Sequence, residues 1–181
     1  MHRSKKILVT CHCILNANAK ITPLATVGGV LVDAVCDYIA AGCGLFQLPC
    51  PEAAYLGMNR WGMTREQYDH PNFRAFCRDI LRYPLIQLQA FVQAGYELVG
   101  VLGMDGSPNC GVTVTCAGYR GGELCSQSRL GDQIKSLRFI AGKGVFMTEL
   151  LAMLREAGPQ PQLFAVREEQ TNEQKEGEEK P

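Results

Sequence analysis

Short apolar runs alternate with longer amphipathic segments along this chain, and that alternation limits the fold more than any other feature. Apolar runs that are typical of buried strands cover residues 5–11, 44–49, 96–105 and 161–168. Helical spacing of apolar residues is found in residues 29–42, 72–95 and 143–158. Since strands joined by helices form parallel sheets, we predict an α/β fold: a compact, Rossmann-like parallel sheet of about four strands with flanking helices.

Other stretches interrupt this pattern. Residues 50–71 are expected to form a long polar and aromatic loop with at most a helical turn, and the glycine-rich residues 111–131 a loop or hairpin. Pro84 is expected to kink its helix. A chain of 181 residues fits one domain, which we place at residues 1–167. Residues 168–181 carry six Glu, two Lys and no large apolar side chain, so we predict a disordered acidic tail.

Charge and hydropathy exclude some classes of partner. The formal net charge is zero, which gives no indication of binding to nucleic acid or to an anionic membrane. The longest apolar region, residues 25–46, contains Asp33 and Asp37 and is therefore a poor membrane span. No convincing targeting signal is found, so we expect a cytoplasmic protein.

The chain has nine cysteines, although a disulfide framework is not expected in a reducing compartment. Cys13, Cys50 and Cys110 each come just after a predicted strand. Because the carboxyl ends of parallel strands meet at one edge of a sheet, these three thiols are predicted to share a site. Three thiols suit a soft metal ion or an iron–sulfur cluster, and the lack of an evident fourth ligand leaves one position open.

The cysteines also have simpler interpretations. Cysteine is a common buried residue, and we expect core packing for Cys36 and Cys77 on helix faces. Cys11 is an alternative to Cys13 in the shared site, because residues two apart lie on the same face of a strand. His12 would then point the other way, and we expect it to be structural.

Rigid loops surround two of these thiols. Proline flanks Cys50 on both sides, which stiffens the loop that presents the sulfur. Cys110 lies in a turn with Pro108 at its second position, and Gly111 is expected to let the backbone approach closely. A ligand group held in this way stays in place when one metal position is open.

Three segments resemble, in order and spacing, the motifs of the 2-thiouracil desulfidase-like family: "ILVTCHCILN", "LPCPE" and "GMDGSPNCG". The usual forms there are a Ser-Ala-Cys-Leu-Leu-Gly type segment, Cys-Pro-Glu and Ser-Pro-Ser-Cys-Gly. The resemblance covers about residues 5–112. It implies a compact Rossmann-like fold with a 4Fe-4S cluster. By position, the cluster ligands would be Cys13, Cys50 and Cys110, leaving one iron free for the sulfur of the substrate.

The resemblance also implies an activity, the non-redox removal of sulfur from a thiocarbonyl of a small, thiouracil-like heterocycle with release of hydrosulfide. Glu52 matches the glutamate of the second motif and is the candidate general base for a water molecule. Ser107 matches the first serine of the third motif and is the candidate to orient that water or to stabilise developing charge. Asn109 stands where the family usually has serine, and residues 53–71 differ from its best-known members.

Two other classes of function stay open at this point. One is a non-catalytic iron–sulfur protein, either a sulfur carrier or a redox-responsive binding module. The other is a structural zinc site in an α/β binding domain. Arg60 and Trp61 are weaker candidates for contact with a planar heterocycle, because an exposed arginine is usually only a solvated charge.

Overall fold

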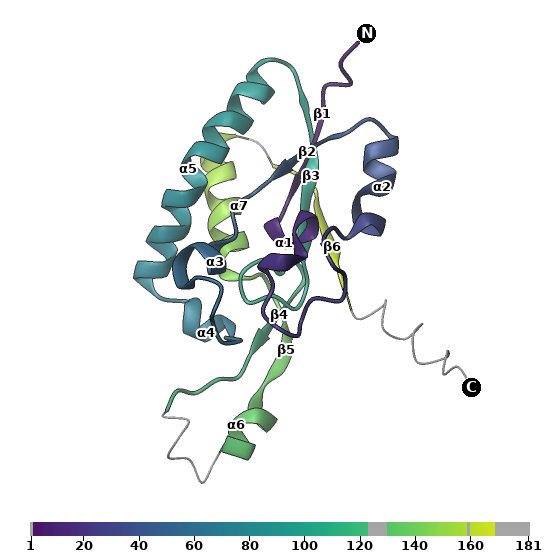
Figure 1. Ribbon diagram of the computed structural model, residues 1–181. Helices are drawn as coiled ribbons and strands as arrows, with labels where there is room; N and C mark the ends of the chain where they lie inside the picture. The colour runs from purple at the N-terminus through teal and green to yellow at the C-terminus, as the bar shows by residue number, and fades with distance from the viewer. Residues whose placement is uncertain (1, 123–129, 159, 169–181) are drawn as a thin grey trace, which may run out of the picture.

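The computed structural model describes residues 2–122, 130–158 and 160–168. Its centre is a parallel sheet with the strand order β2-β1-β3-β6 (Figure 1). The strands are β1 (Lys6–Thr10), β2 (Gly44–Gln47), β3 (Glu97–Met104) and β6 (Leu163–Val166). The predicted α/β fold, a parallel sheet of four strands with flanking helices, is confirmed.

Helices cover both faces of this sheet. Helix α2 (Val32–Ala40) lies on one face, where the Tyr38 ring packs 5.8 Å from the Phe164 ring of β6. Helices α5 (Pro71–Gln93) and α7 (Val145–Ala157) pack together on the other face (Figure 1). All three helices were expected from apolar spacing, and their ends differ from the predicted ends by only a few residues. Helix α5 continues through Pro84 as one element.

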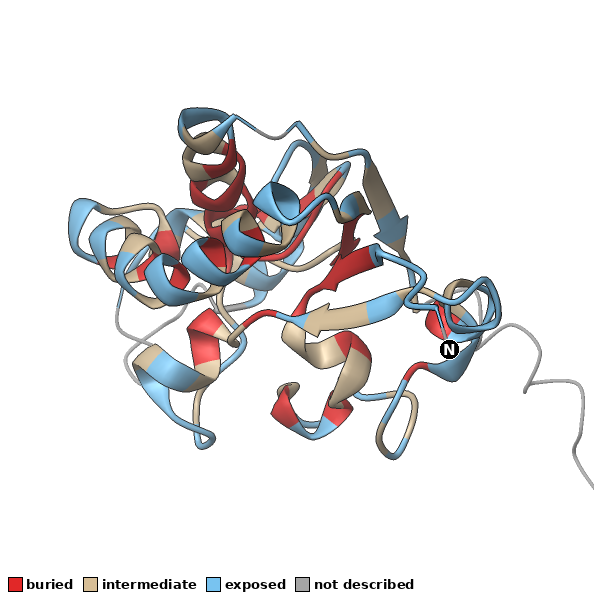
Figure 2. Cartoon of the chain, turned by 90° about the horizontal axis from the view of Figure 1, so that it is seen from above, coloured by how far each residue is buried: buried red, intermediate tan, exposed pale blue. Residues whose placement is uncertain are grey.

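The core lies between the sheet and the pair α5 and α7. In the view from above, buried residues line the strands and the inner sides of the helices (Figure 2). Helix α5 contributes buried side chains at intervals of three or four residues, namely Phe73, Cys77, Leu81, Leu85 and Leu88. Such a stripe is the apolar face of an amphipathic helix, which explains why the helix was predictable from the sequence.

An ion-pair network joins α5 to α7 beside this core. Arg74 and Arg78 of α5 both pair with Glu149 of α7, which is otherwise buried. Two arginines compensate for the desolvation of one carboxylate, so the charge can stay next to apolar side chains.

Residues 50–71, expected as a loop, contain two short helices instead. Helix α3 (Pro51–Leu56) begins with proline in its first turn, and the Cys50 sulfur accepts a hydrogen bond from the Ala53 N–H at 3.4 Å. Helix α4 (Arg65–Tyr68) begins with a capping box formed by Thr64 and Gln67. Local capping thus turns a polar sequence into defined structure.

The glycine-rich stretch forms one side of an antiparallel pair. Strand β4 (Val114–Ala117) pairs with β5 (Arg138–Ala141), and α6 (Leu130–Ser136) lies between them in the chain. These elements form an arm that extends from the end of the main sheet (Figure 1). The proposed acidic tail lies outside the described residues, apart from Glu168. No helix of the described ranges is long and apolar enough to cross a membrane.

Gly144 stands where the start of α7 meets the turn that carries Asn109. A methyl group at position 144 would lie well inside the contact distance of the Asn109 backbone, which cannot rotate away. We expect Gly144→Ala to lower the free energy of unfolding by about 1–3 kcal/mol in urea denaturation, because the close approach would be lost. Gly131→Ala is the control, since its Cβ would enter open space in α6. Equal stability of both variants would contradict this packing.

Candidate functional site

Three cysteines follow three neighbouring strands at the edge where those strands end. Cys13 lies in the short helix α1 (His12–Leu15) after β1, Cys50 caps α3 after β2, and Cys110 lies in the turn after β3. Strand β1 is placed between β2 and β3 in the sheet. The topology therefore delivers the three residues from adjacent positions along one edge.

Burial and neighbouring groups raise the pKa of all three thiols. Burial raises the pKa of Cys13, and the charges of Cys110 and Cys50 raise it further. Burial also raises the pKa of Cys50, against the effect of its hydrogen bond from the Ala53 N–H. A hydrogen bond with Cys11, followed by burial, raises the pKa of Cys110. The pKa of Cys13 responds to Cys110 and Cys50, and that of Cys50 responds to Cys110, so the three thiols lie within range of one another's charge.

The three strand-end cysteines form a donor set of thiols only. In the part of the chain that the structure describes, no three His, Cys, Asp or Glu side chains come close enough to hold one metal ion. Thiols alone make up the set, and thiols are the ligands that iron–sulfur clusters use.

The two cysteines of the first motif have different surroundings. Cys11 is fully buried, and it acts to raise the pKa of the Cys110 thiol. Cys13 is half-buried and interacts with both Cys50 and Cys110. Both cysteines of the first motif therefore lie within reach of Cys110. His12, expected to be structural, has its Nδ1 atom 3.3 Å from the Leu48 carbonyl oxygen.

Ser107 organises the turn that carries Cys110. Its hydroxyl oxygen accepts hydrogen bonds from the backbone N–H groups of Asn109 at 3.2 Å and of Cys110 at 3.0 Å. A hydrogen bond from Ser107 also acts to lower the pKa of the Cys110 thiol. The predicted close approach at Gly111 is confirmed, because a Cβ there would collide with the carbonyl oxygens of Val114 and Ser107.

Asp105 holds the far side of the same turn, and the sequence analysis missed it. Its Oδ1 atom accepts the backbone N–H groups of Val112, Thr113 and Val114 at 2.9, 2.8 and 3.2 Å. Burial acts to raise the pKa of this carboxyl, but hydrogen bonds from Thr113 and its neighbours hold it below the usual value. The only sequence signal is an Asp at a strand end followed by Gly-Ser-Pro.

Glu52 lies in the first turn of α3 and is 9% exposed. Its Oε1 atom accepts a hydrogen bond from Asn109 Nδ2 at 3.0 Å, and its Oε2 atom one from Arg60 Nε at 3.3 Å. The second and third motifs are thus joined through a buried carboxylate. An ionised carboxylate offers about four acceptor positions, so it can accept further bonds.

The interpretation of Arg60 as an exposed charge was wrong. Its side chain is 3% exposed, pairs with Glu52, and donates to the carbonyl oxygens of Ala19 at 2.5 Å and Gly57 at 3.1 Å. The irregular segment 57–63 folds this side chain inward, whereas Trp61 next to it is 81% exposed. Arg60 therefore belongs to the site through Glu52.

The two helix-face cysteines differ from each other. Cys77 is buried in α5, as expected. The expectation of core packing was wrong for Cys36, which is exposed on α2. Helix α2 buries only Val35 among its residues, so most of its surface faces away from the core.

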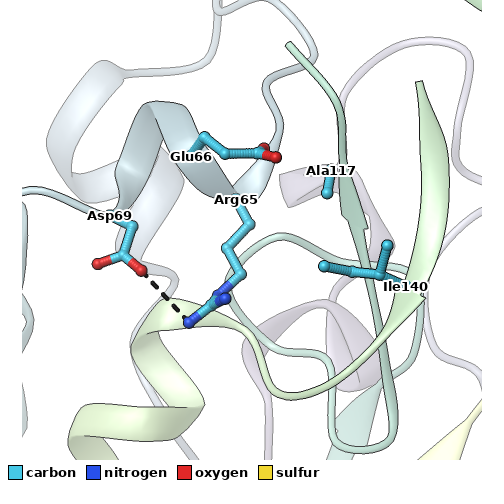
Figure 3. A pocket seen from close by; sticks show the side chains of 5 residues that line it. All are labelled: Arg65, Glu66, Asp69, Ala117 and Ile140. Carbon is cyan, nitrogen blue, oxygen red and sulfur yellow. Dashed lines mark ion pairs between the residues drawn. The ribbon is translucent and has the colours of Figure 1, made fainter. Parts of the chain in front are cut away.

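A cavity of about 290 Å³ lies between α4 and the arm (Figure 3). Arg65 pairs with Asp69 at 3.3 Å on its wall, and Glu66 accepts a hydrogen bond from the Gly118 N–H at 2.9 Å. Ala117 and Ile140 of the arm complete the lining. None of the residues that the sequence proposed for the site lines this cavity, which belongs to the junction of α4 with the arm.

Fold and site together define a class: an α/β protein with a row of strand-end thiols and a buried carboxylate beside them. The uncharacterized protein MJ0003 of Methanocaldococcus jannaschii is 32% identical over 110 residues, which are 61% of this chain and 70% of that protein. This chain belongs to the family of MJ0003. No protein-family model matches it.

A likeness to a known structure is weaker. The chain is similar to the 4Fe-4S-dependent thiouracil desulfidase TudS with a TM-score of 0.45 and 20% sequence identity, over 93% of this chain and 94% of that one. A likeness of this size establishes neither a shared reaction nor a shared substrate.

Asp105→Asn tests whether the carboxylate holds the Cys110 turn. The amide cannot accept the same set of charge-assisted hydrogen bonds, so we expect a loss of about 1–3 kcal/mol in the free energy of unfolding and faster amide exchange at residues 112–114. Asp79→Asn, on the exposed side of α5, is the matched control. Unchanged exchange in the Asp105 variant would show that the turn does not depend on this side chain.

Proposed function

We propose that this chain is a desulfidase that removes sulfur from the thiocarbonyl carbon of a small thiolated heterocycle. The observation that carries the proposal is the placement of Cys13, Cys50 and Cys110 just after three adjacent parallel strands, with buried Glu52 in the helix that Cys50 caps. These three cysteines would hold a 4Fe-4S cluster, and the resemblance of the motifs supports the choice of reaction.

The reaction requires no net oxidation or reduction. Water adds to the thiocarbonyl carbon. A carbon–oxygen double bond then forms as the carbon–sulfur bond breaks. The sulfur leaves as hydrosulfide, which keeps one of the two water protons, and the other proton is released. The bound cluster would supply an iron with an open position, a Lewis acid that makes the carbon more electrophilic. The residues of the chain must then orient the water and accept its proton.

Glu52 is our candidate for proton acceptance. Glu52 lies two residues after Cys50, and its carboxylate is held by Arg60 and Asn109, one on each oxygen. Each oxygen keeps a free acceptor position that a water molecule can use. A general base must lie within hydrogen-bond reach of the proton that it takes, and the fixed carboxylate would meet this requirement for a water molecule bound at one of those acceptor positions.

Ser107 has a supporting part in this proposal. Its hydroxyl oxygen accepts hydrogen bonds from the backbone N–H groups of Asn109 and Cys110. A hydrogen bond from Ser107 also acts to lower the pKa of the Cys110 thiol. We therefore assign Ser107 to the positioning of the Cys110 thiol, with a smaller effect on turnover than Glu52.

Loss of a ligand cysteine should remove the cluster. We expect Cys50→Ser and Cys110→Ser protein to carry almost no iron after anaerobic reconstitution, because an alcohol is a far poorer iron ligand than a thiolate. Cys36→Ser is the control on the exposed surface of α2 and should keep its iron. The measurement is iron and sulfide per chain, and a normal iron content in the Cys50 variant would refute the ligand assignment.

The same iron assay on two further variants tests whether Cys13 or Cys11 is the first cluster ligand. Cys13→Ser should lose the cluster and Cys11→Ser should largely retain it, because Cys13 interacts with both other thiols. The reverse result would assign the ligand to Cys11.

Glu52→Gln should keep the cluster and the fold but lose turnover by about 10²–10⁴-fold, because the amide cannot accept a proton. Hydrosulfide release from a panel of thiolated heterocycles, 2-thiouracil among them, measures the effect. Ser107→Ala should be milder. Full activity in Glu52→Gln would remove Glu52 from the reaction. If the unsubstituted protein contains the cluster but releases no hydrosulfide from any of these compounds, the result would favour a sulfur carrier or a binding module.

A further inference from the structure

Lys20 is a nearly buried cation at the edge of the sheet where the strands end. It follows the short 3-10 helix η1 (Ala17–Ala19), and its side chain is only 10% exposed. An ammonium group loses favourable hydration when it is buried, and this loss must be offset by nearby negative charge. The groups that surround Lys20 therefore indicate what its charge is for.

The carboxylate of Glu168 holds Lys20 in place. Glu168 lies shortly after β6, and its Oε2 atom pairs with the Lys20 ammonium group. Its Oε1 atom accepts a hydrogen bond from the Thr26 hydroxyl at 2.9 Å. Lys20 and Thr26 both belong to the segment between α1 and α2, so Glu168 fixes this segment against the end of the sheet.

Contacts on two sides place the ammonium group beside the segments that carry the cysteines. Lys20 Nζ lies 3.8 Å from the Sδ atom of Met104, the last residue of β3. The Met104 N–H donates to the Cys110 carbonyl oxygen at 3.0 Å. On the other side, the carbonyl oxygen of Ala19 accepts a hydrogen bond from Arg60. The ammonium group is thus enclosed among the strand ends and is separated from the Cys110 turn by one side chain.

The electrostatic effects agree with this placement. Burial lowers the pKa of Lys20, while Cys13 and Cys110 act to raise it. Burial and then the charge of Cys110 raise the pKa of Cys13, and Lys20 acts against them. Arg60 acts in the same sense on Cys50, whose pKa is raised chiefly by burial. The two cations therefore act on different thiols, Lys20 on those of the first and third motifs and Arg60 on that of the second.

A cluster held by three cysteines needs positive charge nearby. Three thiolates carry more negative charge than the oxidised 4Fe-4S core neutralises, and reduction adds a further negative charge. Hydrosulfide, the product of the proposed reaction, is also an anion. Negative charge is costly in a site that is shielded from water unless a cation lies close to it.

We propose that Lys20, held in place by Glu168, is the charge-compensating residue of the strand-end thiol site. This rests on the proposed function, in particular on its cluster, and it adds a residue from outside the three motifs. Lys20 acts through its charge, which stabilises the reduced cluster and the departing hydrosulfide. Glu168 has two effects of opposite sense, because it orients the ammonium group and also offsets part of its charge.

The test is a redox titration of the cluster, which needs no turnover. Full-length protein is reconstituted without oxygen, and the ratio of reduced to oxidised cluster is followed by electron paramagnetic resonance against the applied potential. Lys20→Met removes the charge at nearly the same side-chain length. We expect the ratio at a fixed potential to fall about tenfold, the effect of a unit charge about 10 Å away at an effective dielectric constant of about 20. Lys6→Met, at the exposed start of β1, lies at the opposite end of that strand and should keep the ratio of the parent.

Two further variants separate charge from packing. Lys20→Arg keeps the charge and should match the parent. Glu168→Gln removes a negative charge and should raise the ratio, the opposite of Lys20→Met, whereas a loss of packing would not give shifts of opposite sign. Unchanged ratios in Lys20→Met and Glu168→Gln, or a fall in both, would overturn the inference. If Lys20→Met retains no cluster, the direction of the shift in Glu168→Gln decides.

The same proteins separate this inference from the reaction. Opposite shifts in a protein that releases no hydrosulfide from any thiolated compound would support the role of Lys20 and refute the desulfidase. Unchanged ratios in a protein that releases hydrosulfide would do the opposite. A parent protein that assembles no cluster would refute both.

Discussion

The parallel pairing of β1 with β2 on one side and with β3 on the other determines where the candidate site residues can lie. Thr10 is in register with Gln47 of β2 and with Leu102 of β3. One further backbone bond is made on each side, from the Leu48 N–H to Thr10 and from the Cys11 N–H to Leu102, both at 2.9 Å. Beyond these bonds the three strands separate, and the segments that carry the cysteines follow them.

Glu52 connects these segments once the strands have ended. Glu52 accepts a hydrogen bond from Asn109, which lies in the Cys110 turn, and it forms an ion pair with Arg60. Arg60 in turn donates to the carbonyl oxygen of Ala19, in the segment that follows α1. A buried carboxylate with this many donors needs all of them to remain in place, because an unpaired charge in the interior is costly. Positioning of the thiols and orientation of the proposed base are therefore parts of one network.

The sheet and its three main helices were predictable because apolar spacing is a local property of the sequence. Helices α3 and α4 were not predicted, although Pro51 and the pair Thr64 and Gln67 are local capping signals within residues 50–71. Burial of Arg60 and of the Tyr68 hydroxyl was not, since both depend on how residues 57–68 fold over strand ends that are distant in sequence. The exposure of Cys36 was missed because apolar spacing predicts that a helix forms, but it does not show how much of the helix surface packs against the rest of the protein.

The central claim is that three strand-end thiols hold one open-site iron–sulfur cluster. Iron and acid-labile sulfide per chain, counted in protein purified and reconstituted without oxygen, test it most directly, together with the visible absorbance. The account predicts a brown protein with about four iron and four sulfide per chain. A colourless protein that contains zinc, or one that retains no metal, would contradict it.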